Sequence, residues 1–547
     1  MKTCKNCCSK FEPRPHEVKF YKEHDLPEPF ECPICRQQRR MLWRNEKNLY
    51  KRKCDLCGKD MVTIYSPDKL FKVYCQDCFW GDKWNAHDYG REVDFGRPFF
   101  EQFAELMVEV PRLAVVNKKS ENSEYCNYSF ANKNCYLTFG NHYEWDCLYG
   151  HYSTKNKNCV DYLQLYKSEL CYDILFSKNC YNCVALNHCE NCHDCLFSVD
   201  LKSCEHCLFC ANLRHKKYCI FNKEYSKEEY FKKLGKYDLG SYKAFEEAKK
   251  TYRDELSAKF PVRDVYQVNC QDCVGSNLEN CKELFYCFDC AACEDCSYGF
   301  QMDETYDSLD MTCMGYDRSE VCHQTIGCSG LFNCMTCDSC WHGNDLRYCN
   351  MCFTSKNCFG CISVQHGDYC ILNKKYSKEE YAELMGRLVE HMKKTGEWGQ
   401  FFPASLSPFG YNESVAHEYM PLSADEARAK EFNWKKEDKK EFAKQKNEVP
   451  DHIDDVSDSV LDEVMACVEC GRNFKLVPQE LKFYKQVGVP VPRKCSDCRD
   501  RERIALRTPR RLWKRACSKC GVENWTTYSP ERPEKVYCEK CYEGEVY

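Results

Sequence analysis

The stretch from Cys180 to Cys210 reads CYNCVALNHCENCHDCLFSVDLKSCEHCLFC, and its cysteines stand at positions 180, 183, 189, 192, 195, 204, 207 and 210. Every one of these numbers is divisible by three, and the same phase extends from Cys126 to Cys219. A repeat of three residues fits neither the turn of an α-helix nor the alternation of a β-strand. Short extended segments joined at corners would return every third side chain to an equivalent place. The stretch therefore predicts a narrow β-solenoid of either hand.

A second cysteine array keeps the same phase from Cys270 to Cys370. Its phase slips by one residue at two places, between Cys273 and Cys281 and between Cys296 and Cys313. Turn-like polar triplets precede several cysteines, with Asn-Lys-Asn before Cys135 and Cys159, and Ser-Lys-Asn before Cys180 and Cys358. We therefore expect two solenoids built on one plan.

Both arrays end in nearly the same sequence, Tyr218 to Tyr230 and Tyr369 to Tyr381, offset by 151 residues. Capping-box pairs predict that helices begin there and cover the open end of each stack, and a third pair predicts another helix. These pairs are Ser226 with Glu229, Ser377 with Glu380, and Ser423 with Glu426. Before the first array, Pro98 begins an amphipathic helix that we expect to cap its opposite end. The apolar face of that helix holds Phe99, Phe103, Leu106, Met107 and Val110.

The two ends of the chain repeat each other with a displacement of 463 residues. Each end carries four pairs of cysteines with two residues between the members of a pair. The pairs are Cys4/Cys7, Cys32/Cys35, Cys54/Cys57 and Cys75/Cys78, then Cys467/Cys470, Cys495/Cys498, Cys517/Cys520 and Cys538/Cys541. One module of eight cysteines therefore occurs twice.

Two such pairs suffice for a tetrahedral thiolate shell around one ion, so the sixteen cysteines predict about four Zn²⁺ sites. We expect sequential pairs to share an ion, although an interleaved arrangement, such as Cys4/Cys7 with Cys54/Cys57, also fits the spacing. A four-sulfur shell has no open position, so these sites are expected to fold the chain rather than to catalyse. The alternative is a set of buried free thiols.

The segments from Cys4 to Arg36 and from Cys467 to Arg499 share Cys-x2-Cys, Phe-Tyr-Lys, a proline-containing approach and Cys-x2-Cys-Arg. In these features they resemble the short bacterial zinc-ribbon family. The resemblance implies zinc binding and carries no activity. One departure is Cys8, which stands where the second copy has Gly471; that turn is expected to differ, and Cys8 could compete as a ligand.

Each module carries its strongest positive charge between its two halves. Residues 36–53 hold eight basic residues and one acid, and residues 499–515 hold eight basic residues and two acids. Interleaved lysine, arginine and aromatic side chains are typical of surfaces that bind RNA or single-stranded DNA; the alternative is a solvated basic helix. The candidate contacts are Arg36, Arg39, Arg40, Trp43, Arg44, Lys51 and Arg52, then Arg499, Arg507, Arg510, Arg511, Trp513, Lys514 and Arg515.

The central cysteines allow three interpretations. The first is ladders of inert buried thiols, because cysteine is small and apolar. The second is further zinc sites, at Cys189/Cys192/Cys195 or Cys204/Cys207/Cys210 with His188 or His206. The third is iron–sulfur ligation or thiol redox chemistry. The run Cys287, Cys290, Cys293, Cys296 is similar to a ferredoxin loop, but its last spacing is two and no proline follows.

Composition limits the class of protein. The chain has 49 cysteines in 547 residues, no apolar stretch of about 18 residues and no hydrophobic signal at its start. We therefore expect a cytoplasmic protein without a membrane partner, with its cysteines reduced or metal-bound. The net charge of −5 does not by itself imply a polyanionic partner. No phosphate-binding loop, nucleophile elbow or His-Glu-x-x-His motif occurs, so no catalytic residue is assigned and an enzyme is not expected.

These features predict a mainly β, multidomain chain in which two solenoids with capping helices are flanked by duplicated zinc-ribbon modules. The expected segments are residues 1–80 (double zinc ribbon), 81–125 (helical cap), 126–222 (first solenoid), 223–262 (helical insert), 263–371 (second solenoid), 372–447 (helical and irregular cap), 448–466 (flexible acidic linker) and 467–547 (double zinc ribbon). The expected function is a zinc-binding interaction protein whose partner is RNA or a ribonucleoprotein. The alternatives are a protein–protein scaffold and a metal-storage or redox protein.

Overall fold

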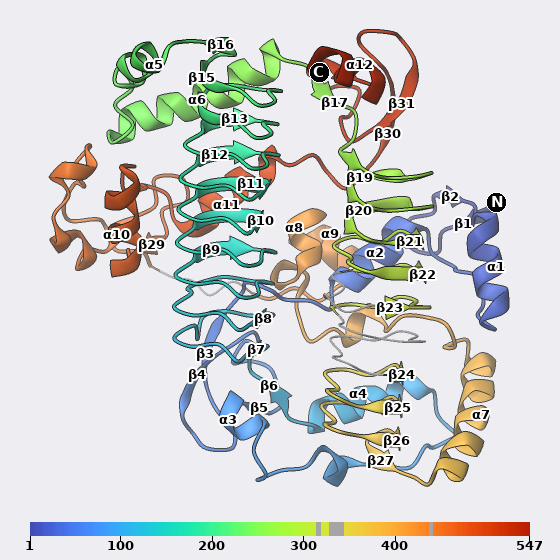
Figure 1. The fold of residues 1–547 in the computed structure, drawn as a ribbon. Helices are drawn as coiled ribbons and strands as arrows, with labels where there is room; N and C mark the ends of the chain where they lie inside the picture. Colours follow the sequence, from blue (N-terminus) through green and yellow to red (C-terminus); the bar gives the residue numbers. More distant parts are fainter. Residues whose placement is uncertain (313–318, 328–343, 437–440, 547) are drawn as a thin grey trace. The chain divides into compact units, whose positions relative to one another are not determined.

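The computed structural model describes residues 1–312, 319–327, 344–436 and 441–546. They form two compact units (Figure 1). The first unit contains residues 1–115, 265–436 and 510–512, and the second contains residues 116–264, 437–509 and 513–547. Each unit therefore combines one cysteine array with the ribbon module from the opposite end of the chain.

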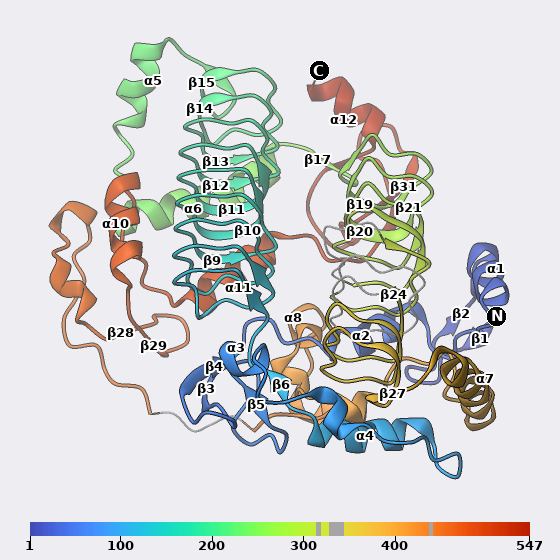
Figure 2. The same cartoon turned by 60° about the horizontal axis from the view of Figure 1, so that its bottom comes forward.

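The first array is a parallel β-solenoid, which confirms the predicted fold class (Figures 1 and 2). Each turn takes twelve residues, so that Val160 pairs with Leu148 in one neighbouring turn and with Tyr172 in the other. The strands are β9 (Leu148–His151), β10 (Val160–Tyr166), β11 (Tyr172–Lys178), β12 (Val184–Asn187), β13 (Leu196–Val199), β14 (Glu205–Leu208) and β15 (Lys217–Ile220). Before them, β7 (Asn117–Lys118) pairs with β8 (Ser129–Phe130).

Left-handed residues make the corners of the solenoid and explain its three-residue phase. Asn134, Asn158 and Asn179 have φ of 53°, 50° and 53°, and each stands directly before an inward-facing cysteine. Asparagine tolerates this conformation better than most residues, which accounts for the polar triplets in the sequence. Corner side chains also bond from turn to turn, because the Asn134 amide donates to Asp146 Oδ1 at 2.9 Å. Side chains at the corners therefore point outward.

The interior of the first array contains an unbroken ladder of cysteines at intervals of twelve residues. Its members are Cys135, Cys147, Cys159, Cys171, Cys183, Cys195, Cys207 and Cys219, all at most 2% exposed. Each thiol lies close to backbone carbonyls: Cys171 Sγ donates to the oxygens of Glu169 at 3.3 Å and Cys180 at 3.6 Å. A thiol that donates hydrogen bonds is protonated, so this geometry favours inert buried ladders.

The second array follows the same plan with two irregular turns. Gln267 pairs with Leu278 across an eleven-residue turn, which agrees with the first predicted slip. Thr305 pairs with Ser319 across fourteen residues, so the second slip is a turn two residues longer than usual; Cys313 lies outside the described residues. The strands are β18 (Gln267–Val268), β19 (Val274–Glu279), β20 (Phe285–Ala291), β21 (Glu294–Ser297), β22 (Thr305–Leu309), β23 (Ser319–Glu320), β24 (Asn344–Arg347), β25 (Lys356–Phe359) and β26 (Asp368–Ile371).

A short strand and a helix close each array at its C-terminal end. β16 (Lys223–Glu224) and β27 (Lys374–Lys375) turn back antiparallel on β15 and β26. The predicted helix starts are confirmed, because α5 (Lys227–Leu234), α7 (Lys378–Thr395) and α9 (Ala424–Ala429) begin after Ser226, Ser377 and Ser423 with complete capping boxes. Tyr230 packs on Tyr218 at 5.8 Å, and Tyr381 packs on Tyr369 at 5.7 Å.

The helix predicted after Pro98 forms, but its expected position is wrong. In α4 (Phe99–Glu109) the predicted face is buried, yet Phe99 contacts Phe359 at 5.3 Å and Tyr348 at 5.6 Å, both in the second array. The cause is the segment that follows: β6 (Arg112–Leu113) pairs in parallel with β5 (Val73–Tyr74) of the N-terminal module. The helix therefore belongs to the first unit and does not cap the first array.

The acidic run from Glu448 to Glu463 is not a flexible tether. It forms two short 3-10 helices, η4 (Ile453–Asp455) and η5 (Asp458–Leu461). Ile453, Val456 and Val460 are buried in the apolar core of the second unit. Apolar residues spaced three or four apart anchor the run despite its charge.

The ribbon modules consist of short hairpins and helices. In the N-terminal module these are β1 (Lys2–Thr3), β2 (Lys10–Phe11), α1 (Pro15–Glu23), α2 (Pro33–Met41), β3 (Tyr50–Lys53), β4 (Asp60–Thr63), β5 and α3 (Gln76–Phe79). In the C-terminal module they are β28 (Met465–Ala466), β29 (Asn473–Phe474), α10 (Pro478–Val487), α11 (Ser496–Leu506), β30 (Trp513–Ala516), β31 (Glu523–Thr526), β32 (Val536–Tyr537) and α12 (Glu539–Val546). The remaining elements are η1 (Ala86–Tyr89), α6 (Tyr242–Lys259), β17 (Val262–Arg263), η2 (Ala404–Leu406), η3 (Tyr411–Glu413) and α8 (Val415–Tyr419).

Among the helices described, none combines the length and the apolar character needed to cross a bilayer.

Candidate metal centres and ribbon docking sites

The sixteen terminal cysteines gather into four groups of four. The groups are Cys4/Cys7/Cys32/Cys35, Cys54/Cys57/Cys75/Cys78, Cys467/Cys470/Cys495/Cys498 and Cys517/Cys520/Cys538/Cys541. Within each group all Sγ atoms lie within 4.8 Å of one another. The structure thus groups the pairs in sequential order and not in the interleaved order that the spacing also allowed.

The sulfur distances suit a tetrahedral metal site. The Sγ atoms of Cys7 and Cys32 are 3.7 Å apart, and those of Cys57 and Cys75 are 3.9 Å apart. In the C-terminal module, Cys520 and Cys538 are separated by 3.8 Å. Four thiolates at about 2.3 Å from a central ion would stand about 3.8 Å from each other. The four groups can therefore each hold a metal ion.

Backbone N–H groups prepare three of these groups for a thiolate. The Cys75 N–H points at Cys54 Sγ at 3.3 Å, and the Cys538 N–H points at Cys517 Sγ at 3.3 Å. Burial raises the pKa of these thiols, but the hydrogen bonds outweigh it and lower the pKa of Cys54 to about 7 and that of Cys517 to about 6. The pKa of Cys467 is likewise lowered to about 6. Metal binding requires this deprotonated form.

The turn at Cys8 is the same as the turn at Gly471, contrary to expectation. Cys8 has φ of 59° and Gly471 has φ of 73°, and their N–H groups bond to the carbonyls of Cys4 and Cys467 at 3.0 Å and 2.9 Å. Cys8 is exposed and is not a member of its neighbouring group. The group Cys4/Cys7/Cys32/Cys35 therefore forms without Cys8.

The central cysteines do not form comparable groups. Across residues 1–312, 319–327, 344–436 and 441–546, the four terminal groups are the only sets of three or more potential metal ligands. The triplets at Cys189 and Cys204 lie in the buried interior of the first array, and the ferredoxin-like run at Cys287 lies in that of the second.

A buried aspartate on the second array holds the first ribbon of the N-terminal module. Arg36 Nε donates to Asp310 Oδ2 at 2.6 Å, and Arg40 lies 3.2 Å from Asp310 Oδ1. On the same corner row, the Tyr298 hydroxyl donates to Glu17 at 3.0 Å. These five side chains define what we term the Asp310 docking site.

The C-terminal module repeats this arrangement on the first array. Arg499 Nε donates to Asp161 Oδ2 at 2.7 Å, Arg503 lies 3.6 Å from Asp161 Oδ1, and the Tyr149 hydroxyl donates to Glu480 at 2.8 Å. These side chains form the Asp161 docking site. Its module residues are displaced from those of the Asp310 docking site by 463 positions and its array residues by 149. Two copies of one interface thus hold the two modules.

The charges at the Asp310 docking site are buried and depend on each other. Arg36, Arg40 and Asp310 are at most 1% exposed. Burial raises the pKa of Asp310, but the two guanidinium groups outweigh this and hold the pKa below its usual value. Burial raises the pKa of Glu17, against the opposing effect of Arg36. Removal of one partner would leave uncompensated charge in the interior.

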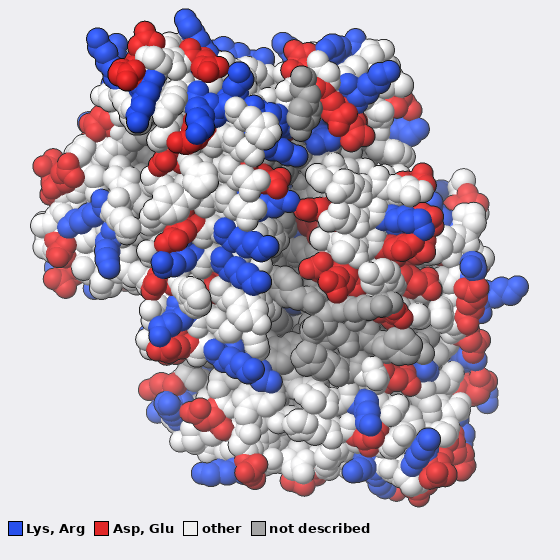
Figure 3. Space-filling view, viewed as in Figure 1, with Lys and Arg blue, Asp and Glu red and all other residues white. Residues whose placement is uncertain are grey.

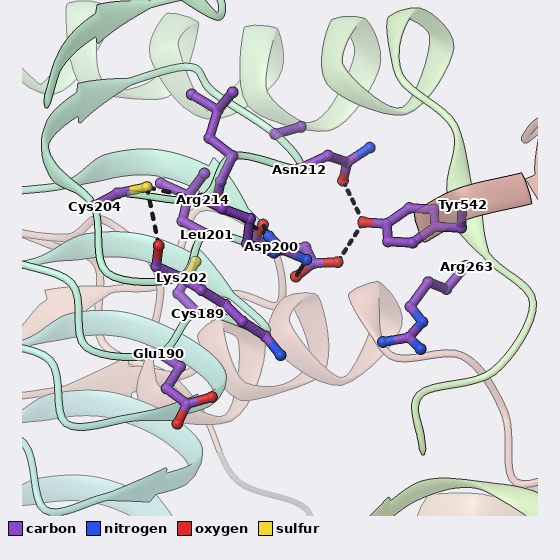
Figure 4. Close-up of polar contacts among 12 residues, drawn as sticks. Cys189, Glu190, Asp200, Leu201, Lys202, Cys204, Asn212, Arg214, Arg263 and Tyr542 are labelled. Carbon is purple, nitrogen blue, oxygen red and sulfur yellow. Dashed lines mark hydrogen bonds and ion pairs between the residues drawn. The ribbon is translucent and has the colours of Figure 1, made fainter. Parts of the chain in front are cut away.

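The second ribbon of the C-terminal module contacts the first array through one tyrosine (Figure 4). The Tyr542 hydroxyl donates to Asp200 and lies 2.8 Å from Asn212 Oδ1. Arg214 also pairs with Asp200, at 2.9 Å. Position 542 corresponds to Phe79 in the first copy, which packs on Phe353 of the second array at 6.0 Å. Sequence reasoning missed these docking residues, because no local motif marks them.

Several predicted nucleic-acid contacts are buried, and for them that prediction is corrected. Arg36, Arg40, Trp43, Arg44 and Arg499 are at most 5% exposed. Trp43 packs on Phe402 with ring centres 4.7 Å apart, and Arg44 pairs with Glu46. The Arg510 side chain is 6% exposed and lies 2.7 Å from Asp289. These groups stabilise the fold and are not available to a ligand.

The other candidates lie closer to the surface. Arg39 pairs with Glu31 at 3.1 Å, Arg52 with Asp55 at 3.0 Å and Lys514 with Glu523 at 3.0 Å. Arg515 donates to two backbone carbonyls, Lys51 and Arg511 are exposed, and Arg507 and Trp513 are half-buried. The face shown in Figure 3 carries both basic and acidic side chains.

Comparison with family models, with curated protein sequences and with solved structures gives no match for this chain.

Proposed function

We propose that the chain is a zinc-bound, non-catalytic scaffold in which metal-held ribbon modules brace two cysteine-ladder solenoids. The observation that carries the proposal is the repeated docking site, in which a tetrathiolate ribbon presents two arginines to one buried aspartate. Four-sulfur shells suit Zn²⁺ and have no open position for a substrate. The metal would fix the ribbon, and the ribbon would in turn cover the outer corner of the solenoid.

A metal-storage or redox function is less well supported by the thiol geometry. The array thiols are buried and donate to backbone carbonyls, as Cys195 does to the oxygens of His193 at 3.3 Å and Cys204 at 3.6 Å. Redox-active cysteines are usually accessible and have a low pKa. Burial instead raises the pKa of Cys147, Cys171 and Cys183 in the ladder.

Hydrogen exchange of the full chain before and after metal removal by a chelator tests the proposal. We expect α1 and α2, and the docked corner around Asp310, to lose protection together when the metal leaves. Strand β12, which carries none of the docking residues, should stay protected, because its hydrogen bonds run between turns. Unchanged protection of α1 and α2 in verified metal-free protein would overturn the proposal.

A matched pair of variants separates the metal from the docking contact. Arg40→Gln should expose the docked corner while the metal content stays at its original level. Cys35→Ser should reduce the metal content and also expose that corner. If the corner stays protected in both variants, the ribbon does not brace the solenoid.

A further inference from the structure

A surface of different character lies on the first turns of the first array, away from the ribbon docking sites. Seven side chains define what we term the lysine–aromatic corner: Lys119, Lys133, Tyr143, Trp145, Lys155, Lys157 and Lys167. Tyr143 is 49% exposed and Trp145 is 54% exposed, although large aromatic residues usually lie in the core. The fold explains the exposure of both side chains, because Tyr143 and Trp145 flank the inward-facing Glu144 in a single turn.

The solenoid register places lysines on both sides of the exposed tryptophan. Trp145 bridges to Lys133 in one neighbouring turn and to Lys157 in the other. Adjacent turns of a parallel β structure lie about 4.8 Å apart. Trp145 therefore lies between two lysine positions in a regular row along the array.

The corner row beside it continues the alternation. Tyr143, Lys155 and Lys167 occupy left-handed corner positions with φ of 55°, 60° and 49°, so their side chains point outward. Tyr143 also contacts Phe130 at 5.6 Å, and the Lys119 amine lies 5.4 Å from the centre of the Phe130 ring. Successive turns between Lys119 and Lys167 thus present exposed aromatic side chains bordered by lysines.

The charge of this corner is only partly neutralised. Glu121 pairs with Lys133 at 3.0 Å, and Glu169 pairs with Lys157 at 3.0 Å. Lys155 and Lys167 form no ion pair with any residue that the structure describes. The Asp146 carboxylate also acts on Lys157. Five lysines therefore face three carboxylates, and an anionic ligand is favoured.

We propose that the lysine–aromatic corner binds single-stranded nucleic acid. Exposed aromatic faces stack on unpaired bases, and lysines placed beside them neutralise the phosphates. An acidic peptide would satisfy the lysines but would have no planar group for Trp145 and Tyr143. A duplex would need an element that projects into a groove, and a row of short solenoid turns is not such an element. The proposal goes beyond the scaffold function and does not depend on the ribbons.

Fluorescence anisotropy of the full-length, metal-loaded protein with a labelled 20-mer of uridine tests this proposal. Binding should weaken as salt rises. Trp145→Ala should weaken binding at least about fivefold, as expected for the loss of one stacked base. The double variant Lys155→Glu with Lys167→Glu should reduce the slope of log affinity against log salt by about 1.4.

Trp525→Ala is the matched control. Trp525 is also 40% exposed, and the Lys514 amine lies 5.3 Å from the centre of its ring, but it belongs to the C-terminal module. It should leave RNA affinity unchanged. Equal binding of polyglutamate, with no effect of Trp145→Ala, would overturn the proposal in favour of an acidic protein partner. Binding that all these variants leave intact would also overturn it. Either result leaves the scaffold proposal standing as long as metal content and ribbon protection are normal.

Discussion

At the scale of single residues, the left-handed backbone conformation determines which residue types a position tolerates. Gly58, Gly471 and Gly521 follow the second cysteine of their groups with φ of 73°, 73° and 77°, and Cys8 takes the same place with φ of 59°. A Cβ at Gly471 would meet no atom within 4 Å, so space is not limiting there. The cost of Cys8 is therefore a backbone cost, of about 1–2 kcal/mol for a residue with a Cβ.

Cys8→Gly and Gly471→Cys should change the free energy of unfolding in opposite directions. Cys8→Gly should raise the free energy of unfolding of the N-terminal module by about 1 kcal/mol, and Gly471→Cys should lower that of the C-terminal module by a similar amount. Urea unfolding monitored in the ribbon helices checks both. A loss of bound metal in Cys8→Gly would show instead that Cys8 is a ligand.

Glu144 is a buried carboxyl group inside the first array. Tyr162 donates to it, and the Asn156 amide lies 2.8 Å from its Oε1. Tyr162 fits because the preceding turn has Gly150, where a Cβ would stand 2.0 Å from the tyrosine ring. Burial raises the pKa of Glu144 to about 8, although hydrogen bonds from Tyr162 and Asn156 oppose the rise.

The raised pKa of Glu144 predicts that stability falls between its ordinary and its raised pKa. The folded state keeps a proton that the unfolded state releases above its ordinary carboxyl pKa, so stability falls as pH rises from about 4.5 to about 8. Glu144→Gln should remove this contribution and become the more stable protein at pH 9, with little difference at pH 4. Urea midpoints at both pH values check this, with exposed Glu169→Gln as control. Parallel pH profiles for wild type and Glu144→Gln would contradict it.

At the scale of elements, the docking sites show how the corner rows are used. Asp161 and Asp310 are both left-handed corner residues, with φ of 59° and 63°, and each follows a corner tyrosine by twelve positions. A ribbon helix presents arginines four residues apart, on one face, to this row. The same geometry in both units shows that the module, the array and the interface between them each occur twice.

Substitution of Asp310 or Asp161 should lower the free energy of unfolding strongly. Asp310→Ala removes the carboxylate that pairs with the buried Arg40 and leaves Arg36 with Glu17 at 3.6 Å, so it should lower the free energy of unfolding by about 3–5 kcal/mol. Asp161→Ala should fall at the lower end of this range, because Arg499 keeps Glu480 and Arg503 keeps Asp173. The control Glu169→Ala breaks an exposed pair and should cost at most about 1 kcal/mol. Denaturant unfolding measures all three. A cost for Asp310→Ala no larger than that of the control would show that the pair does not hold the module.

The sequence predicted the periodic elements well because their signals are local. The three-residue phase of cysteine, the capping boxes at Ser226 and Ser377 and the paired cysteines of the ribbons all act within a few residues. The partners of Arg36 and Arg499 lie in the arrays, hundreds of residues away in sequence, so a run of basic residues looked like a ligand surface. The position of α4 was missed for the same reason, because the pairing of β5 with β6 decides it.

At the scale of the whole molecule, the chain assembles each unit from distant parts. The N-terminal module belongs with the second array and the C-terminal module with the first. Neither array is therefore complete with its sequence neighbours alone.

This arrangement predicts that a fragment of residues 1–262 will aggregate. It holds the first array together with the N-terminal module, which docks on the second array, so the corner residues of the first array would be exposed. Residues 116–264 co-expressed with residues 437–547 should instead form a soluble complex, and size-exclusion chromatography distinguishes the two. A monodisperse, folded 1–262 fragment would contradict this reading.

In the proposed scaffold, thiolates gathered in fours hold the ribbons that brace the solenoids. Elemental analysis of the full chain, purified under reducing conditions, tests it most directly. We predict four zinc ions per chain, three after Cys32→Ser with Cys35→Ser, and four after the ladder variant Cys171→Ala. Metal-free protein with its ribbons still folded, or a metal content that falls with the ladder variant, would contradict the account.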